Sequence, residues 1–157
     1  FTATPSLTSV ALTGTPSTPL PTLPTSPVNT SSIFTPQYVG FTQISTSSNV
    51  FRWGNCPQPS SITFTAHVTD PATEVAVLLF LRLSSPTTGE MTKWEAGASM
   101  NGDKTGTFTY TVTTKNISHY DEYPNAWLQY QMIAIDANFN HVGYTQPYLN
   151  SITFSKC

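Results

Sequence analysis

The sequence predicts an all-β protein, a two-sheet sandwich of seven strands preceded by an extended N-terminal arm. From Phe41 onward, apolar and polar residues alternate with a period of two in seven runs, and turn-forming residues separate the runs every eight to fifteen residues. Before Phe41, threonine, serine and proline dominate, and the first charged residue is Arg52. We therefore divide the 157 residues into a Thr/Ser/Pro-rich arm or stalk at 1–35 and a sandwich at 36–157.

The arm has the composition of a rod. Prolines stand at positions 5, 16, 19, 21, 24 and 27. Each fixes φ near the polyproline II value and lacks a backbone donor, which excludes a helix or a central strand between about 14 and 28. At ~3.1 Å per residue, such a segment reaches on the order of 100 Å and suits a spacer. The alternative is a flexible linker.

Hydroxyl groups beside proline are typical of O-glycosylated stalks. Asn29-Thr30-Ser31 and Asn116-Ile117-Ser118 also match the N-glycosylation pattern. The candidate attachment residues are Thr13, Thr15, Ser17, Thr18, Thr22, Thr25, Ser26, Asn29, Thr30, Ser31, Ser32 and Asn116.

One part of the arm favours a strand. The segment SLTSVALTG, residues 6–14, lies between two prolines and carries Leu7, Val10 and Leu12. A mildly apolar strand of this kind can add to the exposed sheet edge of a neighbouring molecule. Alternatively, the segment is poorer in proline by chance.

The seven runs after the arm are rich in Val, Ile, Thr, Tyr and Phe. They are predicted as strands at 41–53, 61–68, 75–83, 90–100, 106–112, 126–135 and 141–155. No segment shows a sustained period of 3.6, so a two-sheet β-sandwich is expected.

The two cysteines follow this predicted topology. Cys56 precedes the second strand and Cys157 ends the last one. In a seven-strand Greek-key sandwich these positions lie at the same pole, so we expect a disulfide and an oxidising compartment. The bridge would close a loop of about 100 residues and contribute roughly 4 to 5 kcal/mol. The alternative is two unrelated buried thiols.

The segment LQYQMIAIDANFNHVG, in which Tyr130 leads the apolar positions Met132 and Ala134, resembles the penultimate strand of fibronectin type III domains and related immunoglobulin-like folds. The span from Cys56 to Cys157 is similar to immunoglobulin-like modules that bacterial surface proteins carry behind Thr/Pro-rich stalks. The resemblance implies a spacer, an adhesion unit or a fibre building block, and it carries over no catalytic residue.

Three polar strings invite a catalytic or metal-binding interpretation. DKTGT at 103–107 is the string that carries the phosphorylated aspartate in P-type ATPases, but its flanks predict a hairpin turn. Asp136, Asn138 and Asn140 lack the glycine and glutamate of a calcium loop. Ser118 and His119 are too close in sequence to Asp121 for a catalytic triad. We expect turns and a polar loop, no catalytic residue, no cofactor, no metal and no enzyme.

Charge and hydropathy exclude two classes of partner. A net charge of −2 without a basic cluster argues against nucleic acid. The longest apolar run, VAVLLFL at 75–81, is far shorter than the ~20 residues of a membrane span. Among the aromatic residues, Trp94 stands in a polar run, so it is the candidate for contact with a sugar or a partner; core packing is the alternative.

Two functions follow from these expectations. The first is a structural subunit of an extracellular or cell-surface filament or layer, a head-to-tail polymer of this chain. The alternative is an adhesion or carbohydrate-binding module on a glycosylated stalk of a larger surface protein, and a sensor domain of a membrane protein is the runner-up.

Overall fold

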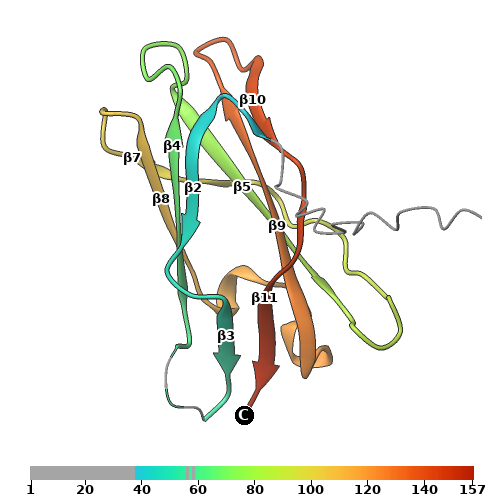
Figure 1. Ribbon diagram of the computed structural model, residues 1–157. Helices are drawn as coiled ribbons and strands as arrows, with labels where there is room; N and C mark the ends of the chain where they lie inside the picture. Colours follow the sequence, from blue (N-terminus) through green and yellow to red (C-terminus); the bar gives the residue numbers. More distant parts are fainter. Residues whose placement is uncertain (1–37, 56, 58) are drawn as a thin grey trace, which may run out of the picture. The chain divides into compact units, whose positions relative to one another are not determined.

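The computed structural model describes residues 38–55, 57 and 59–157. In this part of the chain the elements are strands and two short 3-10 turns (Figure 1). The strands are β1 (Tyr38–Val39), β2 (Phe41–Thr46), β3 (Val50–Trp53), β4 (Ile62–Val68), β5 (Ala76–Ser84), β6 (Ala98–Ser99), β7 (Asn101–Gly102), β8 (Thr107–Val112), β9 (Asn125–Ile135), β10 (His141–Thr145) and β11 (Tyr148–Lys156). The 3-10 turns are η1 (Thr114–Asn116) and η2 (Tyr120–Glu122).

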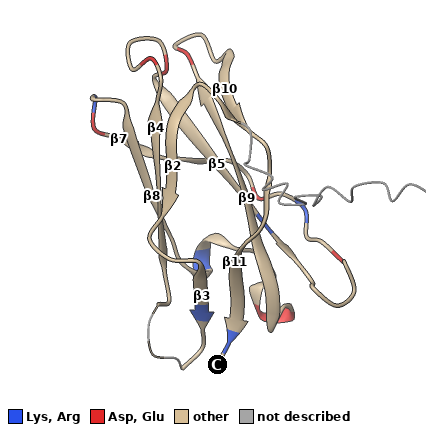
Figure 2. Cartoon of the chain, in the orientation of Figure 1, with Lys and Arg blue, Asp and Glu red and all other residues tan. Residues whose placement is uncertain are grey.

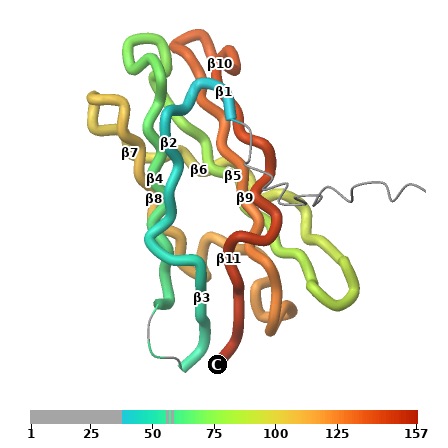
Figure 3. The backbone as a smooth tube through the Cα atoms, viewed as in Figure 1, coloured from blue at the N-terminus to red at the C-terminus, as the bar shows by residue number. Residues whose placement is uncertain are grey.

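The larger sheet is built around β9. One edge of β9 pairs with β5 along its length, and the other edge pairs with β10 near one end and with β11 near the other. Outside these, β1 pairs with β10, β3 pairs with β11, and β6 pairs with β5. All of these pairs are antiparallel except β3 with β11, which run side by side to the same end of the sheet (Figure 3).

The smaller sheet has the order β2-β4-β8-β7, and every pair in it is antiparallel. Strand β4 alternates strictly between buried and half-buried residues, because one of its faces covers the core. The all-β prediction is confirmed, and the two sheets form two layers compatible with a β-sandwich (Figure 1).

The core lies between the two sheets. Leu79, Leu128 and Met132 from the larger sheet and Ile62 and Phe64 from the smaller one are fully buried. Their burial follows from the period of two, which directs alternate side chains of each strand to the same face. The Phe64 ring meets the Tyr130 ring edge to face with centroids 4.9 Å apart, so an aromatic contact joins the layers.

Three predicted strands differ from the observed ones. The run at 41–53 is two strands in different sheets, β2 and β3. The run at 141–155 is likewise divided, because Gln146 and Pro147 separate β10 from β11. The predicted strand at 90–100 is wrong for most of its length, since only β6 and an isolated bridge between Ser84 and Met91 are regular.

Charged side chains lie mainly at strand ends and in the connections (Figure 2). The predicted turns carry two of the acidic groups. Asp103 lies between β7 and β8, and Asp136 lies between β9 and β10. Both strings therefore serve as hairpin connections, as the sequence predicted.

Candidate functional site

Among the described residues, strand β2 lies at the edge of the smaller sheet, where a strand from another chain could pair with it. It is the first strand in the order of the smaller sheet and pairs with β4 along one side. Its sequence, FTQIST, has no charged residue and no proline, which are common protections of an edge strand. Phe41 is buried and anchors the strand, while Thr42 and Gln43 are exposed.

The end of β2 is held in place by a few polar contacts. The Thr42 hydroxyl donates to the carbonyl oxygen of His67 at 3.2 Å, and the Tyr38 hydroxyl donates to the carbonyl oxygen of Thr42 at 3.3 Å. Strand β2 is therefore positioned by its neighbours. The predicted assembly residues Leu7, Val10 and Leu12 lie outside the described residues.

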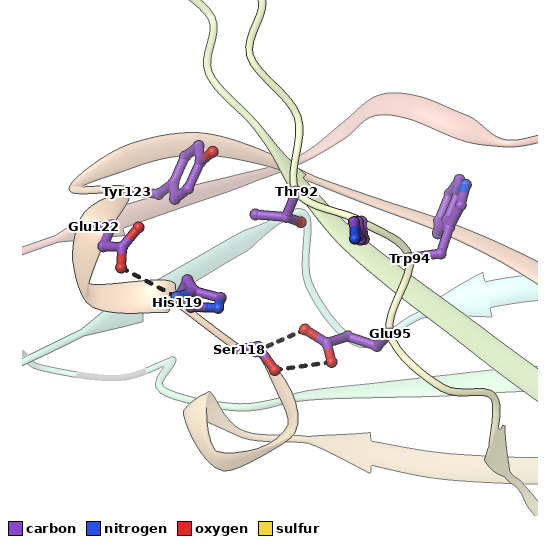
Figure 4. Close-up of a pocket in the computed structure, with 8 residues that line it drawn as sticks. Thr92, Trp94, Glu95, Ser118, His119, Glu122 and Tyr123 are labelled. Atoms are coloured by element: carbon purple, nitrogen blue, oxygen red, sulfur yellow. Dashed lines mark hydrogen bonds and ion pairs between the residues drawn. The ribbon is translucent and has the colours of Figure 1, made fainter.

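A pocket of about 470 Å³ lies between two connections, residues 92–95 and 118–123 (Figure 4). The Glu95 carboxylate ties them together, because its Oε1 accepts from the Ser118 backbone N–H at 2.7 Å and its Oε2 accepts from the Ser118 hydroxyl at 3.0 Å. On the other wall, His119 Nδ1 lies 3.1 Å from Glu122 Oε1. Tyr123 supplies an aromatic ring to the same pocket.

These contacts do not make a catalytic triad. The Ser118 hydroxyl is hydrogen-bonded to Glu95 rather than to His119. The acidic partner of His119 is Glu122 rather than Asp121. The polar-loop interpretation of this segment agrees with the 3-10 turn that it forms. The geometry can hold a polar ligand, since hydroxyl, imidazole and carboxylate groups surround an open cavity.

Trp94 lies at the border of this pocket and is half-buried. The Arg82 guanidinium stacks over its ring, with Cζ 4.3 Å from the ring centroid, and Arg82 Nε donates to Gln129 Oε1 at 2.7 Å. Figure 4 shows the indole directed away from His119 and Tyr123. One face of the Trp94 ring therefore already has a cationic partner. The rings of Trp94 and Tyr123 do not form one continuous surface on which a sugar could stack.

The exposed carboxylates of Asp103 and Asp136 accept hydrogen bonds within their own hairpin turns. Hydrogen bonds from Thr105, first from its hydroxyl and then from its backbone N–H, lower the pKa of Asp103 to about 2. Bonds from Asn140 likewise lower the pKa of Asp136. Within the part of the chain that the structure describes, no group of three or more His, Cys, Asp or Glu side chains could hold a metal ion.

The predicted disulfide has one end in the structure. Cys157 follows β11, and its backbone N–H donates to the carbonyl oxygen of Trp53 at 3.1 Å. Cys56 lies three residues beyond Trp53 but outside the described residues. The parallel pairing of β3 with β11 thus places the chain on each side of the predicted bond at the same end of the sheet, and the bond itself stays a prediction.

One predicted glycosylation residue is described. Asn116 is half-buried in η1, where its Oδ1 accepts from the Thr113 backbone N–H at 2.8 Å and its Nδ2 donates to the Tyr110 hydroxyl at 3.0 Å. A glycan on Asn116 would share Nδ2 with this bond. The other attachment residues, in the arm from Thr13 to Ser32, lie outside the described residues.

Sequence reasoning missed the contact between Glu95 and Ser118, which are 23 residues apart. It also missed the stacking of Tyr130 on Tyr148, whose ring centroids are 4.4 Å apart. No local signal marks either pair, because the first depends on how two distant connections meet and the second on the register of β9 with β11.

No helix in the described ranges is long and apolar enough to cross a membrane. Comparison with protein-family models, with curated proteins and with solved structures finds no match for this chain.

Proposed function

We propose that this protein is a non-enzymatic structural subunit of an extracellular filament or surface layer, assembled through its N-terminal arm and its sandwich. The observation that carries the proposal is strand β2, which is an edge strand among the described residues, pairs there with β4 alone and has neither charge nor proline. Soluble proteins usually protect such an edge, because its backbone groups are a template for pairing with another chain. In this proposal, the arm strand at 6–14 of a second copy is the partner.

The chemistry of the arm suits this role. Several backbone hydrogen bonds, each of about 0.5 to 1.5 kcal/mol net, would form along β2, and burial of Leu7, Val10 and Leu12 would add to them. Prolines in the remainder of the arm reduce the conformational entropy that ordering removes. Since the arm of one copy meets the sandwich of the next, the contact is head-to-tail and repeats into a filament unless the rotation closes a ring.

The proposed family character is that of an immunoglobulin-like or fibronectin type III-like module. It is supported by the division of the first run between β2 in one sheet and β3 in the other, and by the parallel pairing of β3 with the last strand. Modules of this architecture are used as rigid units in surface proteins, which is compatible with an extracellular location and a glycosylated stalk.

Deletion of residues 1–14 tests the arm. The truncated protein should stay folded by circular dichroism and should no longer form filaments in electron micrographs. Gln43→Lys, an exposed position in β2, should weaken assembly of the intact chain because a charge at the edge opposes pairing. Asn101→Lys, an exposed position in β7 at the other end of the same sheet, is the matched control and should assemble normally. Normal filaments from the truncated chain would refute the arm contact.

Recognition of glycans is a second candidate function, and the pocket beside Trp94 favours it. The Tyr123 ring can stack on a sugar face, and the carboxylates and hydroxyls that line the same pocket can form hydrogen bonds with the sugar hydroxyl groups. Titration with neutral oligosaccharides of glucose, galactose and N-acetylglucosamine, followed by NMR, would test it. Tyr123→Ala should abolish binding and Phe139→Ala, in a remote hairpin, should not. An unchanged spectrum of the wild-type protein with all three sugars would exclude this function.

A further inference from the structure

The outward face of the larger sheet carries a continuous apolar row. Val39 pairs with Tyr144, Tyr144 with Ile133, and Ile133 with Leu78, so four strands contribute one side chain each at the same level. The neighbours of Leu78 in β5, Val77 and Leu79, point into the core. By the alternation of strand side chains, the row therefore lies on the opposite face of the sheet.

The row is accessible in the described chain. Val39 is 52% exposed and Tyr144 is 50% exposed, while Ile133 and Leu78 are half-buried. Adjacent levels of the same face add Ala76, Phe80 and Gln131. None of these residues is charged, and the nearest charged side chain along β5, Arg82, is engaged by Gln129 and Trp94. Strands β9 and β10 contain no Lys, Arg, Asp or Glu, and their ribbons are tan in Figure 2.

We propose that this row is an interface between two copies of the chain, packed face to face. The absence of charge from the row favours a second copy as the occupant. Two identical charged faces would repel each other, whereas two identical uncharged apolar faces meet without a Coulomb cost. With a two-fold axis along the strands, Val39 of one copy faces Leu78 of the other and Tyr144 faces Ile133. Each aromatic or branched side chain then meets an aliphatic one.

The size of the row sets the strength of the contact. Seven side chains, each in a cell of ~4.8 Å between strands and ~6.8 Å along a strand, cover on the order of 230 Å² per copy. This is less than a third of the ~800 Å² per partner that a stable complex buries, so the contact is weak by itself. Arm-mediated assembly would strengthen it by holding copies at a high effective concentration. The inference thus deepens the proposed function: it rests on that function for its role but not for its geometry.

The test uses the full chain with the arm contact blocked by Val10→Lys and Leu12→Lys. Sedimentation equilibrium up to about 1 mM, the range of weak contacts, should show a monomer–dimer equilibrium. Adding Tyr144→Lys should raise the dissociation constant at least tenfold, and Val39→Lys should act in the same direction. Phe139→Lys is the matched control, since Phe139 is 81% exposed in the hairpin that leads to β10 but lies outside the row.

A blocked chain that stays monomeric, or a Tyr144→Lys variant that dimerises as strongly as the control, would overturn the interface. These results leave the arm contact standing, because the blocked chain does not use it. If the blocked chain still forms filaments, the arm contact fails instead. If adding Tyr144→Lys to the blocked chain then abolishes those filaments while adding Phe139→Lys does not, the interface is supported. Survival of the filaments with Tyr144→Lys would overturn it. Thermal unfolding of each variant verifies that the fold is intact.

Discussion

Gly40 and Gly143 lie back to back where the chain passes from β1 in the larger sheet to β2 in the smaller one. A β-carbon on Gly40 would lie 2.6 Å from the Gly143 Cα and 2.7 Å from Oε1 of the buried Glu74. Gly40 also has a φ of +80°, a conformation that residues with a β-carbon rarely adopt. The change of sheet therefore requires glycine at this position for two independent reasons.

We predict that Gly40→Ala destabilises the protein by about 2 kcal/mol or more, from backbone strain of roughly 1 to 2 kcal/mol and from the added collision. Gly89→Ala is the matched control, because Gly89 has a φ of +74° but no atom within 4 Å of its β-carbon position. Urea unfolding of both variants separates the two costs. Equal losses would show that the close approach to Gly143 is relaxed at no cost.

The sequence predicted most of the strands because period-two alternation survives wherever one face of a strand is buried. It did not predict the division of the run at 41–53. The residues between Thr46 and Val50 are small and polar, and they fit an extended strand as well as a bend between sheets. The positive φ of Gly40 is likewise invisible in a residue pattern.

The failed strand at 90–100 has a different cause. The Thr92 N–H donates to Leu83 O and the Glu95 N–H donates to Leu81 O. The two donors are thus three residues apart, whereas their two acceptors are two residues apart. This spacing is incompatible with a regular antiparallel ladder. The same irregular path carries Trp94 to Arg82 and Glu95 to Ser118. The pocket therefore could not be predicted from alternation alone.

Cys56 and Cys157 are predicted to be bonded. Mass analysis after alkylation should detect two modified thiols only when the protein has first been reduced. Cys157→Ser should lower the free energy of unfolding by about 4 kcal/mol in the chain-entropy account, and adding Cys56→Ser should cost little more. Two alkylated thiols in the unreduced protein would contradict the bond and the oxidising compartment.

Glycosylation of the arm is the next prediction. Proteolytic peptides that cover residues 13–32, taken from material of the native source, should have masses above those of the unmodified sequence. Chemical release of O-linked sugars should remove the excess from the segment between Thr13 and Ser32. Peptide masses equal to those of the unmodified sequence would contradict the predicted stalk.

Acid should weaken the β7–β8 hairpin. Folding lowers the pKa of Asp103 to about 2 from its ordinary value of 3.8, mainly through the Thr105 hydroxyl. The stability contributed by this group is therefore present above about pH 4 and is lost as the pH falls toward 2. Asp103→Asn should be less stable than the wild type at pH 7, and the difference should shrink by pH 2. A difference that is constant over this range would show that the carboxylate charge has no part in it.

Alkaline pH should act through Tyr130. Burial, followed by the adjacent Tyr148, raises the pKa of the Tyr130 hydroxyl above its ordinary value of 10.0, while a hydrogen bond with Ser151 opposes the shift. Because the folded state holds this proton more tightly than the unfolded state, the stability from Tyr130 is complete below pH 10 and declines as the pH rises toward the folded-state pKa.

Tyr130→Phe removes both the titration and the hydrogen bond. At pH 7 the variant should be less stable by about 1 kcal/mol, the net contribution of one such bond. Above pH 10 it should lose less stability than the wild type, so the two unfolding curves converge. Tyr144→Phe is the control, because Tyr144 is 50% exposed and its change should leave the alkaline slope in place. If Tyr130→Phe retains the full alkaline loss, ionisation of other tyrosines, Tyr148 first among them, drives unfolding at high pH.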